Sequence, residues 1–269
     1  MARASAVPGV GPDLSAREAA RALAAARLAD ARRLAAAAIR APAPDAIHDL
    51  RVALRRLRAA LELFGAPGAR DDELRRLMGP LGACRDATLR IDWLKGAGAV
   101  GEPLRVAETR RLEALLPRAV ASTRRWLDGR GGAFEAAVAQ LAPRGRFGGH
   151  RLRRRVAAMR RKVARRLRRL PEGLDPAPVH RLRVAAKKLR YAVELLEPAG
   201  PSELRPLRRS LGSLQSILGE LHDADVRIDW LAGARLPARE REALLARARA
   251  ERTRLARRLA RRLRDANPP

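Results

Sequence analysis

Apolar residues recur every three to four positions along nearly the whole chain, the spacing that places side chains on one face of an α-helix. Alternating runs and clusters of Val, Ile and Thr, which are typical of strands, are lacking. The pattern therefore predicts an all-α protein, with Gly- and Pro-rich breakers between helices. Pro117 is expected to kink or divide its helix. The predicted helices cover residues 14–40, 45–64, 71–95, 103–128, 149–170, 177–197, 203–232 and 238–265.

Two helical motifs each occur twice. Residues 47–64 (IHDLRVALRRLRAALELF) match residues 179–196 (VHRLRVAAKKLRYAVELL) at an offset of 132 positions. Residues 81–94 match residues 218–231 at an offset of 137, so the second copy holds five extra residues between its motifs. Short loops between helices favour up-and-down bundles, so we expect two pseudo-symmetric four-helix bundles from an internal duplication. The predicted divisions are a flexible N-terminal segment (1–13), repeat one (about 14–141) and repeat two (about 148–265).

The chain carries a formal charge of +29 over 269 residues. Such a charge repels itself in a compact protein unless counter-ions or a polyanionic partner neutralise it, so a polyanion is the expected partner. Nucleic acid, an acidic membrane surface and a phosphate polymer all satisfy this argument. Hydrophobic residues make up 47% of the chain, enough to build a core despite the charge.

The uncharged residue types narrow these classes. Aromatic residues make up only 3% of the chain, which disfavours recognition of single-stranded nucleic acid by base stacking. Trp93 and Trp230, which close the two copies of the second motif, are expected to pack in the core. The single cysteine, Cys84, excludes an intrachain disulfide framework and is expected to be a packed residue. Every apolar run is short, so neither an export signal nor a membrane span is predicted, and we expect a cytoplasmic protein.

The first repeated motif pairs an apolar stripe with a basic one. Each helical residue advances by roughly 100°, so the leucines from Leu50 to Leu61 form a core-facing stripe. Arginine binds phosphate oxygens in two-pronged fashion, and the basic stripe repeats about once per turn, which suits a phosphate chain. The alternative is a solvated face on which Glu62 and Glu194 pair with nearby arginines. The basic stripe consists of His48, Arg51, Arg55 and Arg58 in the first copy, and of His180, Arg183, Lys187 and Arg190 in the second.

The histidines of the first motif have two open roles. His48 and His180 are expected at about the third position of their helices, after Asp45 and Ala177 as caps, where a charged imidazole is disfavoured. Each could order its helix start or contact phosphate. Metal ligation is disfavoured because neither a carboxylate nor a second histidine shares the same face. His222, in the second motif, is expected to be a structural polar residue.

Carboxylates in the second motif resemble acid/base pairs at first sight. Asp86 and Asp223 lie in a basic context, and a carboxylate beside arginine has a lowered pKa that does not suit proton transfer. We therefore expect these aspartates to form salt bridges with Arg90, with Arg227 or with facing helices.

The paired HxLRVxxxxLR motifs, each followed by LGxxxDAxxRIDWL, resemble the conserved histidine α-helical domain, CHAD, as a single domain over residues 14–265. The resemblance implies two pseudo-symmetric four-helix bundles and binding of inorganic polyphosphate through a basic groove, with association with polyphosphate granules. Relatives are often fused to a CYTH triphosphatase domain, whose hallmark is an ExExK strand motif. The nearest string here, Glu240-Arg-Glu242, lacks the lysine and lies in a predicted helix. We therefore predict a stand-alone binding domain that is not an enzyme and needs no cofactor or metal.

Fifteen residues are the predicted polyphosphate contacts, and those on the fifth predicted helix rest on no sharp motif. Two alternatives stay open: a nucleic-acid-binding basic helical protein, and a metal-dependent phosphate-processing enzyme. The predicted contacts are His48, Arg51, Arg55, Arg56, Arg58, Arg151, Arg154, Arg155, Arg161, Lys162, His180, Arg183, Lys187, Lys188 and Arg190.

Overall fold

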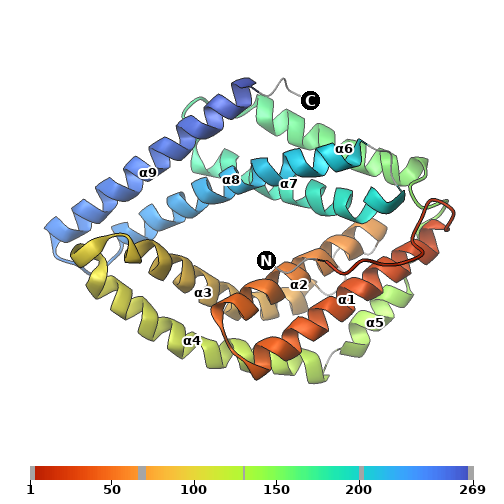
Figure 1. The fold of residues 1–269 in the computed structure, drawn as a ribbon, viewed down its shortest axis with the longest axis horizontal. Helices are drawn as coiled ribbons and strands as arrows, with labels where there is room; N and C mark the ends of the chain where they lie inside the picture. The colour runs from red at the N-terminus through yellow and green to blue at the C-terminus, as the bar shows by residue number, and fades with distance from the viewer. Residues whose placement is uncertain (1–3, 66–70, 130, 200–202, 266–269) are drawn as a thin grey trace. The chain divides into compact units, whose positions relative to one another are not determined.

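The computed structural model describes residues 4–65, 71–129, 131–199 and 203–265. All regular elements among these residues are helices, which confirms the all-α prediction (Figure 1). The α-helices are α1 (Ala16–Arg40), α2 (Pro44–Phe64), α3 (Asp71–Lys95), α4 (Glu102–Gly129), α5 (Gly131–Ala139), α6 (His150–Arg168), α7 (Pro176–Leu196), α8 (Leu204–Ala232) and α9 (Ala238–Asp265). Two 3₁₀ turns, η1 (Gly98–Gly101) and η2 (Glu197–Ala199), complete the described elements.

The eight predicted helices are all present, with ends that differ from prediction by two residues or fewer. Helix α5 was not predicted, because the glycines at its start indicate a loop and its nine residues are too few for clear periodicity. Pro117 was expected to kink or divide its helix; it lies inside an uninterrupted α4, so the division is wrong. A proline also lies inside α3, at Pro80.

The predicted caps of the two motif helices are wrong. Helix α2 begins at Pro44, before the predicted cap Asp45, and α7 begins at Pro176, before the predicted cap Ala177. Proline suits the first helical position because its fixed φ is helical and its missing N–H would be unpaired there in any case. Both motif histidines therefore lie at the fifth helical position and not at the third. The helix dipole acts most strongly in the first turn, which ends before this position.

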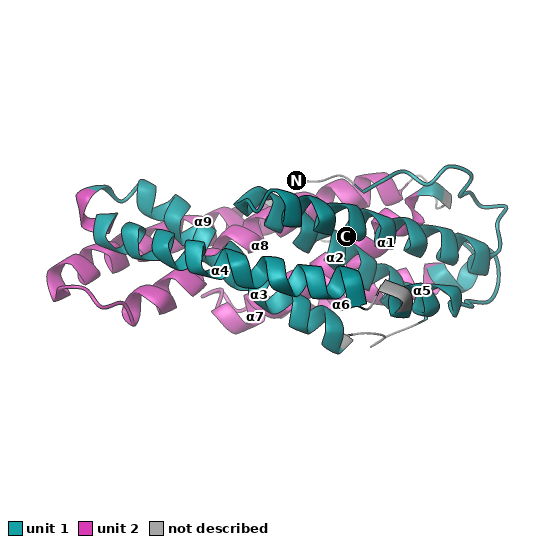
Figure 2. Ribbon diagram, turned by 90° about the horizontal axis from the view of Figure 1, so that it is seen from below, with its two compact units in different colours: residues 1–98, 102–152, 198–200 teal, residues 99–101, 153–197, 201–269 magenta. Residues whose placement is uncertain are grey.

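The chain divides into two compact units (Figure 2). Unit 1 comprises residues 1–98, 102–152 and 198–200. In it, α1 packs against α2 and α4, and α3 packs against the same two helices, so these four form a closed bundle. The predicted leucine stripe of α2, from Leu50 to Leu61, is fully buried in this bundle. Helix α5 packs against α1, and its Phe134 meets Trp126 of α4 edge to face at 5.8 Å.

Unit 2 comprises residues 99–101, 153–197 and 201–269. Helix α8 packs against both α7 and α9, and Arg166 of α6 donates a hydrogen bond to the backbone carbonyl of Arg181 in α7. The apolar stripe of α7, which includes Leu182 and Leu189, is buried as predicted. Helix α8 has 29 residues where α3 has 25, so most of the extra sequence in the second copy lengthens this helix. The duplication and the pseudo-symmetry of the two units stay predictions.

The aromatic and thiol residues of the second motif differ in burial. Trp93 and Trp230 are only half-buried, so the expectation that they lie in the core holds only in part. Cys84 is completely buried, as predicted, and burial raises the pKa of its thiol. Within the described ranges, no helix is both long and apolar enough to cross a membrane.

The segment before α1 is fastened to that helix. The backbone N–H and hydroxyl of Ser5 donate to the carboxylate of Asp30 at 3.0 and 2.5 Å. Arg27 donates to the Ser5 carbonyl at 2.9 Å and to Asp30 at 3.1 Å. Arg27 and Asp30 are both buried, and a buried ion pair needs further hydrogen-bond partners. Ser5, in the N-terminal segment that was predicted to be flexible, supplies such partners to both side chains.

Candidate functional site

Four basic side chains gather on two packed helices of unit 1. His48, Arg51 and Arg55 lie on α2, and Arg85 lies on α3. Burial lowers the pKa of His48, and the positive charges of Arg85 and Arg55 lower it further. Arg55 and Arg85 also act on Arg51, whose pKa burial and these neighbours lower to about 10. The four side chains are therefore close enough to repel one another, which makes this cluster a candidate site for an anion.

Arg51 reaches over the neighbouring helix α3, where a glycine leaves room for its side chain. Its Nη1 donates to the backbone carbonyl of Met78 in α3 at 3.1 Å. A Cβ atom at Gly82 would lie 2.9 Å from the same nitrogen, closer than real contacts allow. The absence of a side chain at position 82 thus leaves the room that the guanidinium occupies. Because the acceptor is a neutral carbonyl, this bond does not neutralise the charge of Arg51.

Arg51 also lines a pocket of about 480 Å³ within unit 1. Asp86 is the acidic residue of the lining, and it attracts Arg51. Arg90 and Arg111, which also line the pocket, both pair with the buried carboxylate of Glu108, at 3.4 and 3.5 Å. One negative charge therefore faces two positive charges. The lining guanidinium groups come from α2, α3 and α4 and belong to Arg51, Arg75, Arg90 and Arg111.

Unit 2 carries basic groups at the same four positions of the repeated motifs. His180, Arg183 and Lys187 lie on α7, and His222 lies on α8. The rings of His180 and His222 have centroids 4.8 Å apart and are tilted by 50°. Burial lowers the pKa of His222 to about 4, helped by the charges of Arg183, His180 and Lys187. His222 therefore lies in a basic cluster of unit 2.

Other predicted contacts of α2 and α7 are engaged locally. Arg58 pairs with Glu62 at 3.2 Å, which confirms the intrahelical pair of the alternative interpretation. Arg190 donates to the Gln215 side chain at 3.0 Å and lies 5.9 Å from the ring centroid of Tyr191. Two more predicted contacts flank these stripes, the half-buried Arg56 and the exposed Lys188.

The predicted contacts on α6 are all exposed. This helix contains ten Arg and Lys residues and no acidic one. Arg151 belongs to unit 1, whereas the other predicted contacts of α6 belong to unit 2. The latter are Arg154, Arg155, Arg161 and Lys162.

The arginines of the second motif form ion pairs with the helix that follows. Arg90 pairs with Glu108 of α4 at 3.4 Å, and Arg227 pairs with Glu251 of α9 at 2.8 Å. Asp86 faces Arg51 of α2 electrostatically, in line with the expected contact to a facing helix. Glu108 and Glu251 thus each pair with an arginine of the preceding helix.

The sequence interpretation missed four residues of this region: Arg75, Arg85, Arg111 and Gly82. A signal for the last was present, since Gly79 and Gly82 stand one turn apart inside a helix. Glycine there costs about 1 kcal/mol relative to alanine, so such a pair indicates close approach by another group.

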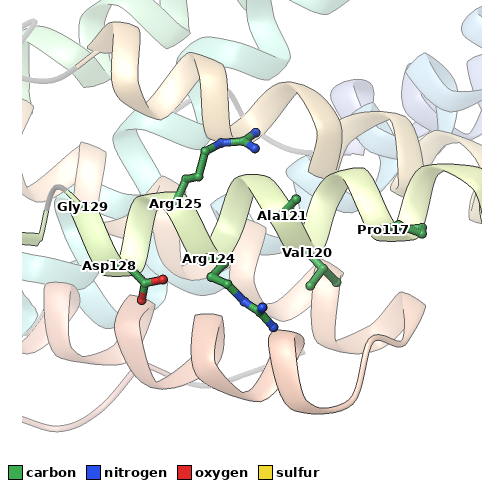
Figure 3. A pocket seen from close by; sticks show the side chains of 7 residues that line it. All are labelled: Pro117, Val120, Ala121, Arg124, Arg125, Asp128 and Gly129. Carbon is green, nitrogen blue, oxygen red and sulfur yellow. The ribbon is translucent and has the colours of Figure 1, made fainter.

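A second pocket of unit 1, of about 630 Å³, follows α4 (Figure 3). Arg124 and Arg125 line it but point in different directions from the helix, so they do not gather charge at one point. The described parts of the chain contain no group of three or more His, Cys, Asp or Glu side chains that is arranged to hold a metal ion.

A family model for the CHAD domain matches residues 22–232. The chain belongs to the CHAD family. Two solved structures share its fold. A CHAD domain from the plant Ricinus communis matches with a TM-score of 0.75 and 23% identity, over 100% of this chain and 98% of the other. PptA from Streptomyces chartreusis matches with a TM-score of 0.67 and 20% identity, over 93% of this chain and 99% of the other. A search of curated proteins found no match to this CHAD protein.

Proposed function

We propose that the protein binds inorganic polyphosphate through the two basic clusters, without changing it chemically. The observation that carries the proposal is the gathering of four basic side chains on two packed helices in each unit. The CHAD family adds support, because its domain is linked to polyphosphate-related proteins. We also propose that the exposed arginines of α6 and Lys162 extend the binding surface.

The energetics of the clusters favour an anionic ligand. The lowered pKa of Arg51 reflects burial and, in addition, repulsion by neighbouring guanidinium groups. A phosphate chain supplies a negative charge at each unit and accepts two-pronged hydrogen bonds from arginine. Each charged hydrogen bond contributes roughly 1.5–3 kcal/mol, so a few contacts per unit suffice for tight binding.

The direct test compares variants of equal charge. Arg51→Gln with Arg85→Gln removes two charges from the cluster of unit 1, and Arg124→Gln with Arg125→Gln removes two charges from α4. Binding of fluorescently labelled long-chain polyphosphate is measured at about 150 mM salt, with circular dichroism to check folding. We expect the cluster variant to lose at least about tenfold more affinity than the α4 variant, which corresponds to one lost charged contact. Equal losses would show that only overall charge matters.

The absence of catalysis is tested separately. Highly purified protein is incubated with polyphosphate and with magnesium or manganese, and free phosphate is measured over time. We expect no release above the protein-free control. Release that persists through purification and disappears in the Arg51→Gln and Arg85→Gln variant would instead indicate an enzyme acting at this cluster.

We further propose that the same clusters direct the protein to polyphosphate granules in cells. A fluorescently tagged wild-type chain should co-localise with stained granules. The double variant of the unit 1 cluster should be dispersed, whereas the α4 double variant should stay on the granules. Granule association that does not depend on the cluster would contradict this proposal.

A further inference from the structure

The two basic clusters differ in one chemically important position. Three of the four positions carry equivalent groups, with histidine, arginine and either Arg55 or Lys187 in each cluster. At the fourth position, unit 1 has Arg85 and unit 2 has His222. Arginine is always charged in proteins, whereas the charge of histidine depends on pH near neutrality. The charge of the unit 2 cluster can therefore change under conditions in which that of Arg85 cannot.

We propose that His222 is a binding residue of unit 2 that takes up a proton when a phosphate polyanion binds. The ring lies 4.8 Å from that of His180, a residue of the proposed binding stripe, so a phosphate group that contacts one ring lies within reach of the other. The inference rests on the proposed function and adds a specific residue and a pH dependence to it. It predicts that affinity rises as the pH falls.

The surroundings of His222 explain why the free protein leaves this ring uncharged. Helix α7 presents His180, Arg183 and Lys187 to it, and all three disfavour a further positive charge. With burial, they lower the pKa of His222 to about 4, so the ring is neutral in the free protein above about pH 5. A bound polyanion reverses the local field, and the charged form then becomes favourable.

The other helices near α8 and α7 add charges that are already paired or directed elsewhere. On α8 itself, Asp223 follows His222 directly in the chain. From α6, Arg166 donates to the Arg181 carbonyl of α7. Helix α9 meets α8 through three ion pairs, in which each acidic group has an arginine partner. These pairs are Arg227 with Glu251, Arg252 with Asp225, and Arg258 with Glu220.

The sign of the effect follows from linkage. If the complex holds more protons than the free protein, lowering the pH favours the complex. One proton taken up strengthens binding by up to about tenfold per pH unit, within the window between the pKa values of the free and bound forms. That window begins near pH 4, the pKa of His222 in the free protein, and extends toward neutrality.

Isothermal titration calorimetry counts these protons directly. The full chain is titrated with long-chain polyphosphate at pH 5.5 in buffers of different ionisation enthalpy. His222→Gln keeps a polar side chain that cannot be charged, and His222→Arg supplies the fixed charge found at Arg85. His150→Gln is the control, since His150 is exposed on α6 outside the clusters. His48 and the terminal phosphates also titrate, but they contribute equally in every variant.

We expect wild type and His150→Gln to take up the same number of protons, and both His222 variants to take up fewer. His222→Gln should bind about tenfold more weakly than wild type at pH 5.5 but equally at pH 8. His222→Arg should bind more tightly than wild type at pH 8. Proton uptake that is equal in wild type and in both folded His222 variants would overturn the inference. Absence of polyphosphate binding by every protein, wild type included, would instead overturn the proposed function.

Discussion

Gly82 allows a sharp test of how Arg51 is held. Replacing it with alanine places a Cβ atom 2.9 Å from Arg51 Nη1, so the guanidinium must shift. The chain provides a matched control, because Gly219 is at the equivalent position of α8. A Cβ atom there meets nothing within 4 Å. The two variants therefore make the same chemical change in the middle of a helix, and only one of them displaces an arginine.

The expected difference follows from two opposing contributions. Alanine stabilises a helix interior by about 1 kcal/mol relative to glycine, and this gain applies to both variants. We expect the shift in Gly82→Ala to break the charged hydrogen bond from Arg51 to Met78, which contributes about 1.5–3 kcal/mol. We therefore expect Gly219→Ala to stabilise the protein by about 1 kcal/mol. Gly82→Ala should destabilise it by roughly 0.5–2 kcal/mol after the two contributions are combined.

Thermal unfolding followed by circular dichroism measures this difference. A change of 1 kcal/mol shifts Tm by about 2–4 °C in a domain of this size class, so the two variants should differ by several degrees. In an Arg51→Ala background, Gly82→Ala should become stabilising, because no guanidinium remains to be displaced. Equal stabilisation by Gly82→Ala and Gly219→Ala in the wild-type background would refute the proposed role of Gly82.

Three further outcomes are expected. Arg252→Ala removes the ion pair and hydrogen bond of buried Asp225 at 2.5 Å and should destabilise the protein by about 3 kcal/mol in urea unfolding at pH 7; a loss below about 1 kcal/mol would contradict a structural role for this pair. Because the folded pKa of His222 is lowered to about 4, the unfolded chain binds more protons as the pH falls below about 6.5, so stability should decline between pH 6.5 and 4. Since His222 is only half-buried, solvent screening reduces its share of this decline to about 1 kcal/mol, and His222→Gln should make the decline smaller by that amount in denaturant titrations at several pH values. Polyphosphate affinity should fall steeply with salt, and Arg183→Gln should make the logarithmic slope less steep; an unchanged slope would remove Arg183 from the site.

The helices and their apolar stripes were predictable because each depends on local periodicity. The leucines of α2 repeat at the helical spacing, and this spacing alone requires that they share a face. The same geometry placed His48, Arg51 and Arg55 on a neighbouring stripe. The starts of α2 and α7 were less predictable, because each has a proline at its first position, one residue before the predicted cap.

Contacts between helices could not be predicted from periodicity. The register of α2 against α3 brings Arg85 to His48, and that of α7 against α8 brings His222 to His180. Packing of several side chains sets this register together, so no single spacing in the sequence encodes it. The pocket beside Arg51 requires in addition a contribution from α4, which follows the motif after a loop. The repeat showed that Arg85 and His222 occupy equivalent positions. That they lie beside His48 and His180 became clear only from the packing of the helices.

Selective binding of polyphosphate by the two clusters is tested most directly by a competition titration. Labelled long-chain polyphosphate is bound at about 150 mM salt and displaced by unlabelled polyphosphate, DNA or RNA at equal phosphate concentration. We predict that wild type prefers polyphosphate and that the preference disappears when Arg51, Arg85, Arg183 and Lys187 are replaced by glutamine. Equal displacement by all three polymers, unchanged in this variant, would contradict the account and indicate a diffuse basic surface that also serves nucleic acid.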